Sequence, residues 1–364
     1  MENPKNKESG DIPERHEGEN NFENQDTPQD AEPARGNKET AAINFDSRIP
    51  LDDLKNAVSK LKAQLGKVIV GQQDFVELLI AGLLSNGHVL IEGVPGVAKT
   101  LTAKLFAKSL ATDFSRIQFT PDLMPSDVLG TSILNSREGE FEFKPGPIFS
   151  NIVLIDEINR APAKTQAALF EVMEERQITI DGKQHDLDAP FMVLATQNPI
   201  EQEGTYALPE AQLDRFLFKI EVGYPSAEDE VNILKTHHER KGNLPINQIE
   251  AVLSPDNLAE LKSQIQEIIV EEKLMHYIAN IVGKTRNHSH VYLGASPRAS
   301  IAVMNASKAF AAIQGRDFVI PEDIKKALNP VLAHRLIISP DREMEGITAK
   351  EVIEMISNSV EIPR

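Results

Sequence analysis

The chain has 364 residues, of which 41% are hydrophobic and 26% charged, a globular balance whose length suggests two or three domains. The absence of cysteine excludes disulfides, thiolate metal sites and cysteine nucleophiles. The net charge of −17 argues against broad, sequence-independent binding to nucleic acid or anionic membranes, which requires basic patches.

Residues 1–45 form a polar, acidic tail that nearly lacks large apolar side chains. Such a segment cannot bury enough surface to offset the entropy of ordering, so we expect it to be disordered. The first residues, MENPKNKESG, lack the apolar segment of a secretory signal. No run of about 18 apolar residues occurs in the chain, so we expect no membrane insertion and a cytoplasmic location.

Strands and helices alternate over residues 46–224. Helical periodicity at 51–65 and an apolar helix at 75–87 precede the strand HVLIEG, and a helix at 162–176 lies between later strands. The later strands are expected at 116–120, 151–158, 191–196 and 215–222. This order predicts an α/β core with a five-stranded parallel sheet covered on both faces.

Two insertions interrupt this core, near 120–146 and 176–188. The first ends in a turn and a strand at 136–146. The second is expected to be a hairpin, because Asp181-Gly182 is a typical tight turn.

Residues 225–340 change to helical periodicity, which predicts an all-helical second domain. Its helices are expected at 226–241, 254–267, 270–287, 297–314 and 321–335. Residues 341–364 are expected to add one C-terminal helix.

The stretch GVPGVAKT (93–100) lies between a strand and a helix and nearly matches a phosphate-binding loop. Backbone N–H groups and the helix N-terminus favour phosphate there, with Lys99 reaching the β- and γ-phosphates and Thr100 holding Mg²⁺. Ala98 replaces the usual second glycine, and we expect it to be tolerated with a negative φ. Alone, the stretch is weak evidence for a nucleotide site, and a structural turn is a serious alternative.

Acids and an amide follow two further apolar strands, at the edge where open α/β sheets bind ligands. Asp156 suits Mg²⁺ organisation, and Glu157 suits orienting or deprotonating a water molecule. Asn198 could bind that water or the γ-phosphate, or only close a turn. The alternative for Asp156 and Glu157 is a solvated pair of strand-end acids.

Two arginines complete the set. Arg215, just before a strand, could stabilise charge on a transferring phosphate, or pair with Asp214 or Glu210. Arg298 lies at the start of a helix, where a cation opposes the helix dipole and a purely structural role is less favourable.

Over residues 48–340 this set resembles the MoxR family of AAA+ ATPases. GVPGVAKT resembles the family's Walker A loop, VLIDEINRAP its Walker B motif, ATQNP its sensor 1, LPEAQLDRF its arginine-finger segment and GASPRAS its sensor 2. VIVGQ (68–72) resembles the segment lining the adenine pocket. The resemblance implies an AAA+ core followed by a helical lid, with the two insertions corresponding to the helix-2 insert and the hairpin before sensor 1.

The resemblance also implies residue roles and cofactors, namely ATP and Mg²⁺. Nucleotide contacts are expected from Val70, Gly71, Gly93, Val94, Pro95, Gly96, Val97, Ala98, Lys99, Thr100 and Leu101. Thr100 and Asp156 would hold the metal, Glu157 would be the catalytic glutamate, Asn198 sensor 1 and Arg298 sensor 2. Arg215 would act on the nucleotide of a neighbouring subunit.

The implied function is an ATP-hydrolysing, chaperone-like ring, usually hexameric, that remodels or matures protein clients. Many relatives of this kind act with proteins carrying a von Willebrand factor A domain. One alternative is a nucleotide-gated binding module with negligible turnover, which would need none of Glu157, Asn198 and Arg215. Another is a DNA-associated AAA+ motor, which the negative charge of the chain disfavours.

Overall fold

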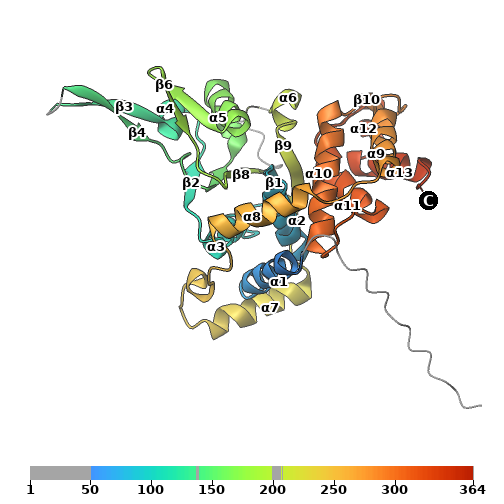
Figure 1. Ribbon diagram of the computed structural model, residues 1–364, viewed down its shortest axis with the longest axis horizontal. Coiled ribbons are helices and arrows are strands. Elements are labelled where there is room, and N and C mark those ends of the chain that lie inside the picture. Colours follow the sequence, from blue (N-terminus) through green and yellow to red (C-terminus); the bar gives the residue numbers. More distant parts are fainter. Residues whose placement is uncertain (1–50, 137–138, 199–205, 207, 364) are drawn as a thin grey trace, which may run out of the picture. The chain divides into compact units, whose positions relative to one another are not determined.

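The computed structural model describes residues 51–136, 139–198, 206 and 208–363 (Figure 1). The acidic tail of residues 1–45, expected to be disordered, lies outside them. In the described part of the chain, no helix is both long enough and apolar enough to cross a membrane.

A five-stranded sheet forms the centre of the fold, with strand order β2-β5-β8-β1-β9 and parallel pairing throughout. Its strands are β1 (His88–Gly93), β2 (Phe114–Gln118), β5 (Ile152–Asp156), β8 (Met192–Gln197) and β9 (Phe216–Val222). The predicted α/β fold with a five-stranded parallel sheet is confirmed. Because the strands are parallel, the ends of β5, β8 and β1 lie side by side at one edge.

Alternate residues of the central strands point into two separate apolar clusters, one on each face of the sheet. In β5, Ile152 and Leu154 belong to one cluster, and Val153 and Ile155 to the other. The first cluster includes side chains of α1 (Asp52–Gly66), α2 (Gln73–Leu84) and α3 (Lys99–Ser109), and the second includes those of α5 (Ala163–Glu175). Helices therefore cover both faces, as the apolar strands predicted.

Each of the two insertions contains a β-hairpin. After the short helix α4 (Pro125–Leu129), β3 (Gly130–Asn135) pairs with β4 (Glu140–Pro145), so this insertion contains a complete hairpin where the sequence predicted a turn and one strand. The second hairpin joins β6 (Gln177–Ile180) to β7 (Lys183–Asp186). Asp181 and Gly182 have φ values of 51° and 74° between those strands, which confirms the predicted turn.

The C-terminal region is mainly helical, where the sequence predicted an all-helical domain. Its helices are α7 (Ala227–Glu239), η2 (Pro245–Gln248), α8 (Pro255–Gln266), α9 (Glu272–Thr285), α10 (Pro297–Ile313), α11 (Pro321–Leu332), α12 (Pro340–Met344) and α13 (Ala349–Ser359). It also contains a short antiparallel pair that the helical periodicity did not reveal, β10 (Val291–Leu293) with β11 (Ile337–Ile338). Helix α10 packs against α2 and α11 against β9, so this region contacts the sheet domain directly.

Candidate functional site

The loop between β1 and α3 has the backbone of a phosphate-binding turn. Gly96 has a φ of 88°, and a side chain at Gly93 would approach the Val222 carbonyl oxygen to 2.6 Å. Ala98 has φ 60° and ψ 20° at the N-cap of α3, so the expected negative φ is wrong. The carbonyl of Ala98 accepts the first helical hydrogen bond from the Thr102 N–H at 2.8 Å, and the chain enters α3 through this left-handed residue.

Lys99 begins α3 and turns its side chain back onto the loop. Its Nζ donates to the Gly93 carbonyl oxygen at 2.5 Å. Burial lowers the pKa of Lys99, and the charges of Asp156, Glu157 and Glu92 oppose that shift. The lysine therefore lies within the electrostatic reach of the two strand-end acids, as the sequence order suggested. Thr100 follows in the first turn of α3 and is half-buried.

Asp156 is the last residue of β5 and is 7% exposed. Its Oδ2 accepts from Arg116 Nε at 2.6 Å, and its Oδ1 accepts from Thr196 Oγ1 at 3.2 Å. Arg116 and Thr196 lie on the neighbouring strands β2 and β8. Sequence reasoning missed both residues. Arg116 stands next to no motif, and Thr196 lies within ATQNP, where only Asn198 was singled out.

Glu157 follows Asp156 with a φ of 57°, a left-handed conformation that places it outside the regular strand. Its Oε2 accepts from Gln118 Nε2 at 2.8 Å and pairs with Arg160 Nε at 3.0 Å. A non-glycine residue held at positive φ is uncommon and is enriched at functional sites. The hydrogen bond from Gln118 and the ion pair with Arg160 fix the direction of the carboxylate.

Asn198 directly follows the last residue of β8, Gln197, and is half-buried. Because β8 lies between β5 and β1 in the sheet, Asn198 stands between the acid pair and the phosphate loop. The fold thus brings the three strand-end predictions to one edge.

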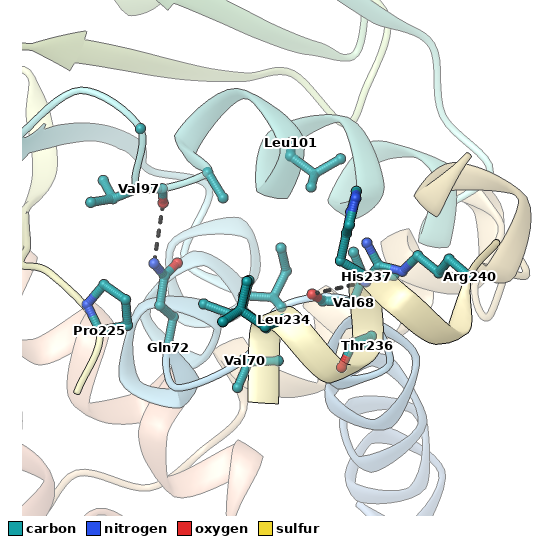
Figure 2. A pocket seen from close by; sticks show the side chains of 14 residues that line it. Val68, Val70, Gln72, Val97, Leu101, Pro225, Leu234, Thr236, His237 and Arg240 are labelled. Atoms are coloured by element: carbon teal, nitrogen blue, oxygen red, sulfur yellow. Dashed lines mark hydrogen bonds between the residues drawn. The ribbon is translucent and has the colours of Figure 1, made fainter. Parts of the chain in front are cut away.

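A cavity of about 260 Å³ lies beside the loop (Figure 2). The segment 68–72 and the loop line one side of it, and α7 lines the other. Val70, Gly96, Val97, Ala98 and Leu101 are predicted nucleotide contacts among its lining residues. Gln72 Nε2 donates to the Val97 carbonyl oxygen at 3.1 Å and so joins the segment to the loop.

Helix α7 and its C-cap supply lining residues that sequence reasoning did not identify: Ile233, Leu234, Thr236 and His237 in the helix, and Arg240 at the C-cap. His237 is exposed and still lines the cavity. Gly71, a predicted base contact, lines the adjoining cavity and has a φ of 74°. A side chain at Gly71 would approach the Asp229 carboxylate to 2.5 Å, so this glycine allows α7 to pack closely.

These residues fit a nucleotide with a divalent cation. Two polar atoms of the cavity lining, Gln72 Oε1 and Arg240 Nε, are buried without a hydrogen-bond partner in the described residues. A base edge would offer such partners. At the other end, the Thr100 hydroxyl and the Asp156 carboxylate provide the oxygen ligands that Mg²⁺ prefers.

Arg215 and Arg298 lie outside the cavity lining and meet at a third residue. Arg215 Nη1 lies 3.3 Å from Glu174 Oε2, and Arg298 Nη2 donates to Glu174 Oε1 at 2.9 Å. The alternative partners predicted for Arg215, Asp214 and Glu210, are wrong. Asp214 pairs instead with Arg335, at 2.6 Å.

Comparison with known proteins agrees with this architecture. The model of the ATPase family associated with various cellular activities (AAA) matches residues 88–218, and the model of the AAA lid domain matches residues 283–356. The protein designated YeaC of Bacillus subtilis is 47% identical over 312 residues, covering 86% of this chain and 97% of that protein. Chaperone MoxR1 of Mycobacterium tuberculosis is 45% identical over 320 residues, covering 85% of this chain and 82% of that protein.

A crystal structure of a Cytophaga hutchinsonii protein superimposes with a TM-score of 0.79 at 44% identity. The match covers 86% of this chain and 97% of that one. The fold and nearly half of the aligned sequence are therefore shared with relatives over most of their lengths. The chain belongs to the MoxR family of AAA+ ATPases.

Proposed function

We propose that this protein hydrolyses ATP in a Mg²⁺-dependent reaction and uses the energy to remodel or mature partner proteins. The observation that carries the proposal is the shared edge of the sheet, where β1, β5 and β8 end beside the N-terminus of α3 and bring together Lys99, Asp156 and Glu157. Cation, carboxylates and helix dipole together form a site for a phosphate chain and an attacking water.

In this proposal each side chain has one task. Lys99 and the N–H groups of the loop bind the phosphates, and Thr100 and Asp156 hold Mg²⁺, which would neutralise charge on the phosphates when bound. Glu157, directed by Gln118 and Arg160, orients the attacking water and accepts its proton. Asn198 stands between them and would hydrogen-bond the water or the γ-phosphate.

We further propose that the active unit is a ring, usually a hexamer in related machines. Arg215 and Arg298 are absent from the lining of the base cavity and lie together at Glu174. This placement supports action on the nucleotide of an adjacent subunit. The chaperone designation of the relative MoxR1 supports protein clients, and proteins with a von Willebrand factor A domain are the partner class to test first.

Glu157→Gln tests hydrolysis against gated binding. The amide keeps the shape of the side chain but cannot accept a proton, so turnover should fall by about 10²-fold or more. Affinity for a fluorescent ATP analogue should stay within about threefold. Glu171→Gln, on the exposed surface of α5, is the matched control and should behave like the parent.

Two other outcomes would replace the proposal. A parent rate no higher than that of Glu157→Gln would support a nucleotide-gated binding module. Strong stimulation of the parent rate by DNA would support a DNA-associated motor.

A further inference from the structure

Glu174 is the point at which two distant arginines converge. It lies in the last turn of α5, whereas Arg215 precedes β9 and Arg298 lies in the first turn of α10 (Figure 1). Each carboxylate oxygen of Glu174 pairs with one guanidinium group. Oε2 lies 3.3 Å from Arg215 Nη1, and Oε1 lies 2.9 Å from Arg298 Nη2. Arg215 Nη1 also donates to the Phe170 carbonyl oxygen of α5.

The local positions of these charges are unfavourable by themselves. A carboxylate at a helix C-terminus and a cation at a helix N-terminus both oppose the helix dipole. Glu174 is the carboxylate at the C-terminal end of α5, whose last turn has no basic residue. Arg298 is the cation at the N-terminal end of α10. Their mutual contact compensates both. Residues that violate local preference and satisfy each other in this way are typical of functional positions.

The backbone before both arginines is anchored independently of Glu174. Asp214, the residue before Arg215, accepts from Ser296 Oγ at 3.2 Å and from Arg335 Nε at 2.6 Å. Ser296 is the N-cap of α10, two residues before Arg298, and the Arg335 side chain is only 4% exposed. Because the backbone is held without Glu174, the contacts of Glu174 act on the direction of the two guanidinium groups.

The cluster keeps positive charge and donors for a further acceptor. Two guanidinium groups and one carboxylate leave one net positive charge. Each guanidinium has five N–H donors. Within the described residues, Arg215 makes its polar contacts through Nη1 only, and Arg298 makes its contact through Nη2 only. Their side chains are 30% and 60% exposed. An anionic ligand approaching from outside the subunit would therefore meet two oriented cations.

We propose that Glu174 is a positioning residue that holds Arg215 and Arg298 together, aimed at the γ-phosphate bound by a neighbouring subunit. The inference rests on the proposed function, in which these arginines act across a subunit interface. Without Glu174, the two like charges repel each other and their long side chains explore solvent. The phosphate must then order both of them at the moment of reaction.

Glu174→Gln tests this inference, with Glu175→Gln as the matched control one residue further along the same helix end. Glu175 is exposed and forms no ion pair with either arginine in the described part of the chain. In Glu174→Gln we expect kcat to fall about tenfold or more with KM for ATP changed by less than about threefold, because the arginines stabilise transition-state charge. The melting temperatures of both variants should match that of the parent within about 2 °C.

A second readout does not depend on turnover. In a Glu157→Gln background, ATP should promote subunit association, which sedimentation velocity measures as a function of protein concentration. Adding Glu174→Gln should raise the concentration of half-association with ATP by about fivefold or more and leave it unchanged without nucleotide. Glu174→Asp retains the charge on a shorter arm and should recover part of the loss.

The possible outcomes distinguish a failure of the role of Glu174 from a failure of the proposed action of the arginines across a subunit interface. If Arg215→Ala and Arg298→Ala lower kcat and ATP-driven association but Glu174→Gln stays within twofold of the parent, the role of Glu174 is wrong. If the arginine variants themselves match the parent, the trans role fails, and the inference fails with it. If Glu174→Gln is as harmful in an Arg215→Ala, Arg298→Ala double variant as in the parent, Glu174 acts by another route and the inference is overturned.

Discussion

His88 should make the protein lose stability as the pH falls from 7 to 5.5. This histidine begins β1 and is 5% exposed. Its Nδ1 accepts from the Val193 N–H at 2.9 Å, so the neutral ring carries its proton on Nε2, 3.0 Å from the Met173 carbonyl oxygen. The neutral ring thus connects the strand that carries the phosphate loop to the end of α5.

Burial lowers the pKa of His88 from 6.5 to about 4, the hydrogen bond to Met173 opposes this shift, and the charge of Arg176 adds to it. The unfolded chain then binds a proton more readily than the folded one, so stability falls as the pH drops from 6.5 towards 4. With an unfolded pKa of about 6.5, linkage gives a loss of about 1 kcal/mol between pH 7 and 5.5. His334, whose pKa burial also lowers well below 6.5, adds a loss of the same sign.

Urea unfolding at the two pH values measures this loss, followed by far-UV circular dichroism because the chain has no tryptophan. His88→Gln should lower stability at pH 7 by about 1–3 kcal/mol through its disturbed buried hydrogen bonds. It should then lose about 1 kcal/mol less than the parent on going to pH 5.5. His276→Gln, at an exposed histidine, is the control and should follow the parent. A parallel loss in the parent and His88→Gln would refute the reasoning.

Three further predictions concern the loop and the tail. Lys99→Ala should abolish binding of a fluorescent ATP analogue, and near-parental affinity in a folded variant would contradict a phosphate-binding role. Ala98→Gly should leave the melting temperature equal or higher, since relief of about 1–2 kcal/mol of left-handed strain offsets about 0.4–1 kcal/mol of added chain entropy; a drop of several degrees would contradict the strain argument. A chain starting near Ile43 should keep the melting temperature and ATPase rate of the full chain, because residues 1–45 cannot build a core, and a marked loss of either would show that the tail packs on the protein.

The three inner strands of the sheet, β5, β8 and β1, were predictable because they are nearly continuous apolar runs. Burial on both faces leaves only such runs, and the motif residues follow directly at their ends. The hairpin of β6 and β7 was equally visible, since its tight turn needs positive φ values, which Asp181 and Gly182 tolerate. Strand β3 was not visible, because GTSILN has no clear alternation and becomes a strand by pairing with β4.

Within the candidate site, the sequence located the side chains but not their partners. The φ of Ala98 is set by the junction of β1 and α3, and residue type alone suggested the opposite sign. Glu174 is distant in sequence from both arginines that it binds, so adjacency pointed to Asp214 instead. The lining residues of α7 have the pattern of a surface helix, and only the packing of α7 beside segment 68–72 turns them toward a cavity.

ATP hydrolysis between subunits is the central claim, and one titration tests it most directly. The specific ATPase rate of the parent should be measured against protein concentration, with sedimentation of the same samples in ATP and Mg²⁺. The rate per subunit should rise with concentration and level off where the assembled species saturates, because the proposal has Arg215 act on a neighbour's nucleotide. A rate independent of concentration, from a species that stays monomeric with ATP, would contradict the claim and leave Arg215 as a structural partner of Glu174.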